Sequence, residues 1–237
     1  MPQSSVPAAE ETAVVAAGAE ATAPKAQGSG IEVADDRQKR LKPRVRARLL
    51  EYAQHTGWLN SVTTRRPVDR DGTPLPWYTY AAINFLDRRV PRDAVVFEFG
   101  SGHSTLWWSA RVASVSAVEH DARWHDEMSP RLPRNVTYRQ IDLDTDGAYA
   151  AAAAGGSYDI IIVDGRDRVN CCRRSLSSLT DRGVVIWDNS DRSRYRNGFD
   201  MLAASGFRRL DFIGNGPINT LPWETAIFYR PGNLLGL

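Results

Sequence analysis

Short apolar runs alternate with segments of helical spacing from residue 77 onward, and this alternation constrains the fold more than any other feature of the sequence. The runs IIIV (160–163) and VVIW (184–187) have no polar alternate face, as expected of strands covered on both sides. Alternating strands and helices predict a parallel sheet with right-handed crossovers. Five such runs follow one another: AVVFEFG (94–100), SVSAVEH (114–120), VTYRQID (136–142), YDIIIVDG (158–165) and GVVIWDNS (183–190).

Helical segments surround and separate these runs. WYTYAAINFLDRRV (77–90) has helical spacing and stops before Pro91. The expected crossover helices include STLWWSARV (104–112), ARWHDEMSPRL (122–132) and RVNCCRRSLSSLT (168–180). Five strand–helix units are therefore predicted.

The end of the chain follows a different pattern. FRRLDFIG (207–214) and TAIFYRPG (225–232) are strand-like, and their connection NGPINTLPWE (215–224) contains two prolines and a glycine. A crossover helix cannot form in such a connection, so this pair is expected to be antiparallel. The sequence thus predicts an α/β fold with a Rossmann-like, doubly wound, seven-stranded sheet, mostly parallel with an antiparallel last strand.

Composition divides the chain of 237 residues into three parts. Residues 1–36 lack aromatic residues and are rich in Ala, Glu, Ser, Pro, Gly and Thr, which predicts a disordered tail. Residues 37–90 are expected to form an N-terminal helical extension and substrate cap, and residues 91–237 the ligand-binding domain. The basic run RQKRLKPRVRAR (37–48) favours a solvated face of a short helix around Pro43, while docking on RNA or an anionic membrane surface stays open.

Charge and cysteine content narrow the setting in which the protein works. The formal net charge of +2 gives no general argument for a nucleic-acid partner. Cys171 and Cys172 are adjacent and leave no spaced disulfide framework, which fits a reducing compartment. No apolar stretch approaches ~18 residues, and the N-terminus lacks the pattern of a secretory signal. We therefore expect a cytoplasmic protein without a membrane span.

A glycine turn, EFGSG (98–102), ends the first predicted strand. Ligands of doubly wound sheets bind beyond the carboxyl ends of the strands near this turn, which places Gly100 and Gly102 at a binding site. The third glycine of a dinucleotide motif is replaced by Thr105, which weakens a nicotinamide or flavin interpretation. Glu98 would repel a pyrophosphate, but it would stabilise a ligand that carries ammonium and sulfonium charges.

Two further acids are expected at the ends of the next strands. Glu119 is placed to accept hydrogen bonds from both hydroxyls of a ribose. Asp142 is placed near an exocyclic adenine amine, although Asp144 and Asp146 follow it and any of the three could cap a helix. Acids at three consecutive strand ends suit a cationic nucleoside better than an anionic one.

EFGSG, AVEH and DIIIVDG, together with the closing strand pair, resemble the class I S-adenosylmethionine-dependent methyltransferases over roughly residues 77–237. The resemblance implies S-adenosylmethionine as cofactor. It assigns the glycine-turn contacts to Glu98, Gly100, Ser101 and Gly102, the ribose contact to Glu119 and, more loosely, the adenine contact to Asp142.

A second resemblance concerns the catalytic step. Asp164 ends the fourth predicted strand, and Asp188 and Asn189 end the fifth, as in the catechol and caffeoyl-coenzyme A type O-methyltransferases. That resemblance implies a metal site of Asp164, Asp188 and Asn189 for Mg²⁺ or another divalent cation. However, the lysine expected after the first Asp is absent from DGRDR (164–168). The alternative is that Asp188 and Asn189 orient a loop, while Asp164 contacts the cofactor or is the base.

These features predict a methyltransferase acting on a hydroxyl of a small molecule, such as a sugar or a specialised metabolite. Asp164, Asp188 and His103 are the candidate catalytic residues, although a structural role is favoured for His103. Two alternatives stay open: a regulatory protein that binds the cofactor without turnover, and a nucleotide-dependent oxidoreductase. The expected acceptor pocket has aromatic walls and two polar contacts: Trp77, Tyr78, Trp223, Asn215 and Asn219. Alternatively, Trp77 begins a core helix and Trp223 fixes its loop.

Overall fold

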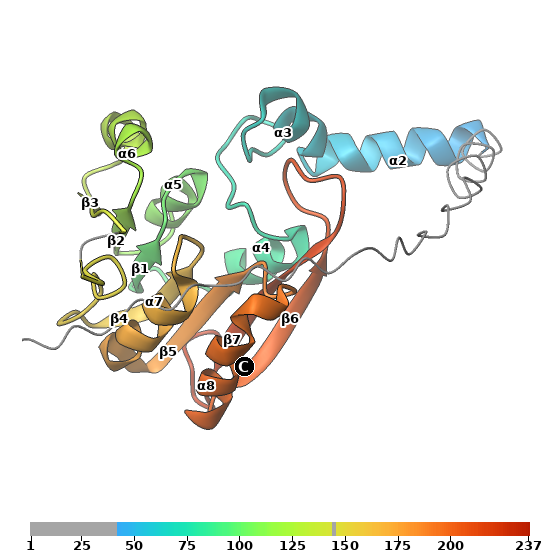
Figure 1. Ribbon diagram of the computed structural model, residues 1–237. Coiled ribbons are helices and arrows are strands. Elements are labelled where there is room, and N and C mark those ends of the chain that lie inside the picture. The colour runs from blue at the N-terminus through green and yellow to red at the C-terminus, as the bar shows by residue number, and fades with distance from the viewer. Residues whose placement is uncertain (1–41, 144–145) are drawn as a thin grey trace, which may run out of the picture. The chain divides into compact units, whose positions relative to one another are not determined.

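The computed structural model describes residues 42–143 and 146–237 (Figure 1). The expected tail, residues 1–36, lies outside the described residues, as do residues 37–41 of the basic run. Residues 43–48 of that run belong to helix α2 (Pro43–His55), which has no buried residue. Residues 47–237 form one compact unit, so the part of the expected extension from residue 47 to residue 90 belongs to the same unit as the sheet.

Seven strands form one sheet in the order β3-β2-β1-β4-β5-β7-β6. The strands β1 to β5 pair in parallel, and β7 is antiparallel to both of its neighbours, β5 and β6. The predicted fold class is therefore confirmed. The strands are β1 (Val95–Phe99), β2 (Ser114–Glu119), β3 (Val136–Gln140), β4 (Tyr158–Val163), β5 (Leu179–Asp188), β6 (Arg208–Gly214) and β7 (Trp223–Tyr229).

Helices cover both faces of this sheet, because alternate residues of its central strands are apolar on both sides. One core cluster joins Val96 and Ile160 to Trp108, and the other joins Phe97 and Ile161 to Cys172. In Figure 1, α7 and α8 lie on one face, over β4, β5 and β7. The remaining helices are α3 (Trp58–Thr64), α4 (Tyr80–Asp87), α5 (His103–Ser109), α6 (Ala122–Met128), α7 (Arg168–Ser175) and α8 (Arg196–Ala204), with short 3₁₀ turns at Ser129–Arg131, Leu176–Ser178 and Ser193–Tyr195.

The connection between β3 and β4 corrects one sequence prediction. The described residues 146–157 of this connection form turns and contain no crossover helix. Gly147 and Gly155, at φ 75° and 78°, take up the left-handed region near its two ends. Hydrogen bonds of mixed spacing, such as Ala151 to Gly147 and Ala154 to Ala151, then close separate turns of backbone.

The segment before α4 is fixed to the sheet by backbone hydrogen bonds. Thr79 N–H donates to Thr225 Oγ1 at 3.1 Å, and Tyr80 N–H donates to the carbonyl oxygen of Asn215 at 2.9 Å. These bonds hold the segment against the β6–β7 connection, at the edge of the sheet where ligands of this fold bind.

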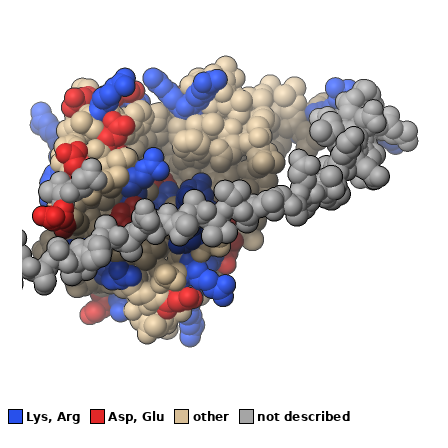
Figure 2. All heavy atoms as spheres, in the orientation of Figure 1, with Lys and Arg blue, Asp and Glu red and all other residues tan. Residues whose placement is uncertain are grey.

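Two surface properties bear on the sequence expectations. Where charged side chains gather on the face drawn in Figure 2, Lys and Arg are interspersed with Asp and Glu. Among the described residues, no helix has both the length and the apolarity needed to cross a lipid bilayer.

Candidate functional site

A pocket of about 470 Å³ opens at the carboxyl ends of the parallel strands. It spans β1 and β4, where the strand order of a doubly wound sheet reverses and where such folds bind ligands. Its walls come from the strand ends, the segment before α4 and the β6–β7 connection. The lining residues are Trp77, Glu98, Gly100, Ser101, Ser104, Glu119, His120, Asp164, Gly165, Arg166, Arg168, Asp188, Asn189, Arg192 and Asn219.

Two glycines let the ends of β1 and β4 approach each other. Gly100 has φ +94°, and a Cβ added to it would lie 3.2 Å from the backbone of Gly165. A Cβ added to Gly165 would lie 2.9 Å from the Gly100 nitrogen and 2.1 Å from the Tyr149 hydroxyl. Side chains at these positions would therefore block the turn, which explains why glycine is needed here. Of the predicted glycine-turn residues, Gly100 and Ser101 line the pocket, whereas Gly102 does not.

Glu98 is buried at the end of β1, with 1 % of its surface exposed. The Thr105 hydroxyl donates to Glu98 Oε2 at 2.6 Å and accepts from the Gly102 N–H at 3.0 Å. Thr105, which replaces the third glycine of a dinucleotide motif, thus holds the carboxyl group in place. Burial raises the pKa of Glu98 to about 8, while hydrogen bonds from Ser104 and Thr105 partly oppose this shift.

Glu119 is held in a single orientation at the end of β2. Its Oε1 accepts the backbone N–H groups of His120 and Asp121 at 2.8 and 3.0 Å. Its Oε2 accepts the Ser101 hydroxyl at 3.0 Å, and that hydroxyl also bonds to Tyr138 at 2.6 Å. The carboxylate therefore reaches the pocket beside the glycine turn.

Asp142 and His103 are not among the described residues that line the pocket. Asp142 is exposed, and its carboxylate accepts the Gln140 amide at 2.7 Å. His103 is the first residue of α5, and burial lowers its pKa to about 4, with further lowering by Arg131 and Arg66. Its imidazole is therefore neutral near pH 7. The structure does not bring either residue to the strand-end acids.

Asp164 and Asp188 end adjacent strands and meet in the pocket. Asp188 Oδ1 accepts the Thr225 hydroxyl at 2.6 Å and the Trp223 indole N–H at 3.0 Å. Burial raises the pKa of both carboxyls. The negative charge of Asp164 raises the pKa of Asp188 further, because two carboxylates this close do not ionise independently.

Arg168, in the first turn of α7, joins the two strand ends. Its Nη2 donates to Asp164 at both the carbonyl oxygen and Oδ1, at 2.8 and 2.9 Å, and its Nη1 donates to the carbonyl oxygen of Asp188. Its Nε donates to the Gly165 carbonyl oxygen at 3.0 Å, and 7 % of the residue is exposed. This role was not predicted, although DGRDR places Arg168 only four residues after Asp164.

Two of the carboxylate oxygens of the predicted metal site are already engaged by protein groups. Asp164 Oδ1 is paired with a guanidinium, and Asp188 Oδ1 already accepts two hydrogen bonds. The positive charge that a divalent ion would supply to Asp164 thus comes from Arg168. Among the residues that the structure describes, no cluster of three His, Cys, Asp or Glu side chains is suited to holding a metal. Asn189, the third expected ligand, lines the pocket in a left-handed conformation at φ 53°.

The predicted aromatic walls are present in part. Trp77 is 44 % exposed and lines the pocket together with Asn219. The alternative that Trp77 begins a core helix is wrong, because α4 begins at Tyr80. Tyr78 is buried beside Trp108, and Trp223 is buried against Asp188, so neither forms a pocket wall. Asn215 is also absent from the lining residues in the described chain.

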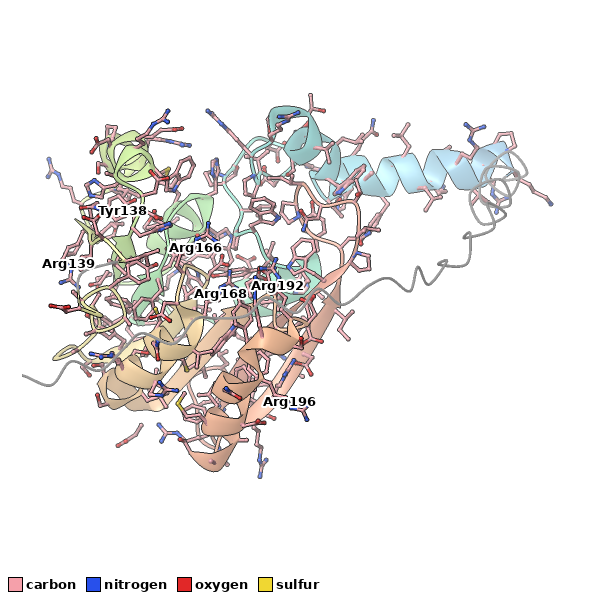
Figure 3. The ribbon with its side chains drawn as sticks, viewed as in Figure 1. Tyr138, Arg139, Arg166, Arg168, Arg192 and Arg196 are labelled. Carbon is pink, nitrogen blue, oxygen red and sulfur yellow. The ribbon has the colours of Figure 1, made fainter. Side chains whose placement is uncertain are left out.

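Arg166 and Arg192 also line the pocket, and sequence reasoning missed both. Figure 3 shows them close to Arg168 in the middle of the domain, whereas Arg139 and Arg196 lie away from this group. Each arginine follows a strand whose end carries a predicted site acid. Arg166 comes two residues after Asp164, and Arg192 comes four residues after Asp188. The presence of basic residues shortly after strand ends is the sequence signal that could have identified these two arginines.

Two solved methyltransferase structures align with this chain. A putative O-methyltransferase from Klebsiella pneumoniae aligns with a TM-score of 0.52 and 18 % identity over 68 % of this chain and 84 % of that one. Precorrin-6y C5,15-methyltransferase from Geobacter metallireducens GS-15 aligns with a TM-score of 0.50 and 14 % identity over 63 % of this chain and 86 % of that one. No protein-family model and no curated protein sequence matches the chain. The chain therefore has the Rossmann-like fold of the class I methyltransferases, as the sequence predicts.

Proposed function

We propose that the protein is an S-adenosylmethionine-dependent methyltransferase that acts on a hydroxyl group of a small molecule. The observation that carries this proposal is the pair of buried carboxyls, Glu98 and Glu119, on either side of the Gly100 turn. A nucleoside with a cationic substituent would favour the ionised form of Glu98 and be stabilised by both acids, whereas a pyrophosphate would be repelled by every carboxylate that is ionised. This charge pattern favours S-adenosylmethionine over NAD or a flavin nucleotide.

The residues present fit this cofactor. Glu119 is fixed by three donors from the protein, and a carboxylate at a β2 end suits the two hydroxyls of a ribose. Glu98 forms no ion pair with the described residues, so a cation of the ligand would find it uncompensated. The bound cofactor would supply an electrophilic methyl group on a cationic sulfur, and the sulfur would keep the electron pair of the carbon–sulfur bond when the methyl group is transferred.

The carboxyl of Asp188 supports a hydroxyl acceptor. A hydroxyl must lose its proton as its oxygen becomes methylated, and the protein has to take that proton. Asp188 lines the pocket, and its raised pKa makes it a stronger base than a solvated aspartate. Trp223 and Thr225 hold one of its oxygens. We assign proton removal to Asp188, and to Asp164 the role of fixing Arg168 between the two strand ends.

Calorimetry with S-adenosylmethionine, S-adenosylhomocysteine and NAD tests the cofactor. We expect the two sulfur nucleosides to bind and NAD to bind at least about tenfold more weakly. Glu119→Gln should weaken nucleoside binding by roughly 1.5–3 kcal/mol, because a charge-assisted hydrogen bond is lost. Glu127→Gln is the matched control, since Glu127 is exposed on the neighbouring helix α6 and does not line the pocket.

Two results would count against the proposal. Equal affinity of wild type and Glu119→Gln would mean that the ribose does not lie at Glu119. Tight nucleoside binding without methyl transfer to any hydroxyl compound of a cell extract, followed with a labelled methyl group, would favour the regulatory alternative.

A further inference from the structure

Arg166 and Arg192 are the pocket arginines whose guanidinium groups are not held by contacts with the described fold. Both are exposed, and their side chains form no hydrogen bond or ion pair with the residues that the structure describes. Arg168 differs in this respect, because its guanidinium is buried and all three of its nitrogens donate to the protein. The two arginines are therefore available to a ligand.

Strand order places these arginines in one half of the pocket. Glu98 and Glu119 belong to the ends of β1 and β2, whereas Arg166 and Arg192 follow β4 and β5 on the other side of the reversal. One half is thus acidic. The other half contains three arginines, including Arg168, and the two carboxyls of Asp164 and Asp188.

The basic half keeps an excess of positive charge. Asp164 is already compensated by Arg168, whose Nη2 donates to its Oδ1 at 2.9 Å. With Asp164 and Asp188 both ionised, this half still contains three guanidinium groups and only two carboxylates. Positive charge of the two exposed arginines is therefore left unbalanced by the carboxyls beside them, in a concave site where charges act more strongly than on an open surface.

We infer that the methyl acceptor is an anion, a hydroxyl compound that also carries a carboxylate or phosphate group bound by Arg166 and Arg192. This inference rests on the proposed function. A guanidinium presents paired N–H donors that match the oxygens of such groups. Trp77 and Asn219 lie on the same pocket and supply an apolar wall and an amide for the rest of the acceptor.

The carboxylate of the methyl donor is a second source of the same chemistry, and the experiment separates the two. Inorganic phosphate is titrated into the protein saturated with S-adenosylhomocysteine, at constant ionic strength with chloride as the balancing anion. The proteins compared are wild type, Arg166→Gln with Arg192→Gln, and the control Arg196→Gln. Arg196 is exposed on α8, four residues after Arg192, and does not line the pocket.

We expect wild type to bind phosphate with a Kd in the millimolar range and the double variant to bind it at least about tenfold more weakly. Arg196→Gln should bind phosphate as wild type does. All three proteins should bind S-adenosylhomocysteine equally well, because the arginines bind the acceptor and not the donor. The exposed positions make misfolding unexpected, and thermal melting checks it.

Three results would overturn the inference. The first is that wild type saturated with S-adenosylhomocysteine does not bind phosphate. The second is that Arg196→Gln weakens phosphate binding as much as the double variant does. The third is that the double variant loses affinity for S-adenosylhomocysteine as much as it loses affinity for phosphate. The last would assign the arginines to the donor carboxylate. A different result would contradict the proposed function itself, namely that wild type does not bind S-adenosylhomocysteine at all. Arginine-dependent phosphate binding to that unloaded protein would keep the anion site but remove its assignment to a methyl acceptor.

Discussion

At the scale of single residues, the strand-end acids differ in how the protein compensates their charge. Asp164 faces Arg168, and Glu119 accepts two backbone N–H groups and a hydroxyl. Glu98 receives hydroxyl hydrogen bonds only, and burial raises its pKa to about 8. The free protein therefore stabilises the protonated form of Glu98, and a cationic ligand would favour its ionised form.

This shift makes the stability of the free protein depend on pH. Because the pKa of Glu98 is raised from 4.5 to about 8, its contribution is fully present below the unfolded-state pKa and is lost as pH rises through the folded-state pKa. We expect the free energy of unfolding to fall between pH ~5 and pH ~8.5, and Glu98→Gln to remove at least about 1 kcal/mol of that fall. Denaturant titrations at both pH values measure it. An unchanged pH dependence in Glu98→Gln would contradict the assignment.

A second residue-scale prediction concerns the base. Trp223 donates to Asp188, and this hydrogen bond lowers the pKa of that carboxyl against the raising effect of burial. Trp223→Phe removes the donor, so the pKa of Asp188 should rise further. Methyl transfer requires the ionised base and is lost as pH falls below its pKa. The acid limb of the pH–rate profile should therefore move upward by about half a unit or more.

A matched change tests whether that shift comes from the hydrogen bond alone. Thr225→Val removes the other donor to Asp188 Oδ1 at nearly constant side-chain volume. It should move the acid limb of the profile in the same direction. A lower rate without a shift in either variant would mean that Asp188 is not the base.

The sequence predicts the acids of the site better than its arginines, for a physical reason. Each acid sits at the end of an apolar run, and strand ends are fixed by the alternation that builds the sheet. Glu98, Glu119, Asp164 and Asp188 therefore meet at one edge, as expected. The direction of a long side chain in a loop, by contrast, depends on the packing of that loop. The roles of the three pocket arginines were consequently not predictable from spacing alone.

At the scale of elements, the contact between the β1 and β4 ends shapes the pocket. Gly100 and Gly165 face each other there, and Tyr149 closes the contact from the β3–β4 connection. The alternation of strands and helices in the sequence predicts a helix in that connection. It instead forms turns that bury Tyr149, Ala150 and Ala153 in the core on one face of the sheet. Helix-favouring alanines there are overridden by flanking glycines and by tertiary packing, which local periodicity does not report.

Gly165→Ala tests this contact. Its Cβ would lie 2.1 Å from the Tyr149 hydroxyl and 2.9 Å from the Gly100 nitrogen, so backbone at the strand ends must move. We expect a loss of about 1–3 kcal/mol in the free energy of unfolding and weaker binding of S-adenosylhomocysteine. Gly214→Ala is the control, because a Cβ at Gly214 meets no atom within 4 Å. A loss of equal size at both glycines would show a general effect of strand glycines and not a specific contact.

At the scale of the whole molecule, the reversal of strand order explains how one pocket holds opposite charges. The chain runs outward from β1 through β2 to β3, and from β4 to β5 on the other side. Acids of the first half and arginines of the second half therefore face each other across the β1–β4 crevice. A cationic methyl donor and an anionic acceptor would each find the opposite sign on its own side.

The last prediction concerns how much of the chain this site requires. Every residue that lines the pocket lies between Trp77 and Asn219, within the compact unit formed by residues 47–237. The described residues of α2 contribute nothing to the core, because none of them is buried. A chain starting at residue 47 should therefore unfold cooperatively at a melting temperature close to that of the full chain, and it should bind S-adenosylhomocysteine with the same affinity to within about twofold. Calorimetry of both chains in the same buffer measures these quantities. If the shorter chain folds equally well but binds the nucleoside far more weakly, residues 1–46 take part in the site. If it loses its cooperative transition, the unit does not fold independently and the pocket depends on the whole chain.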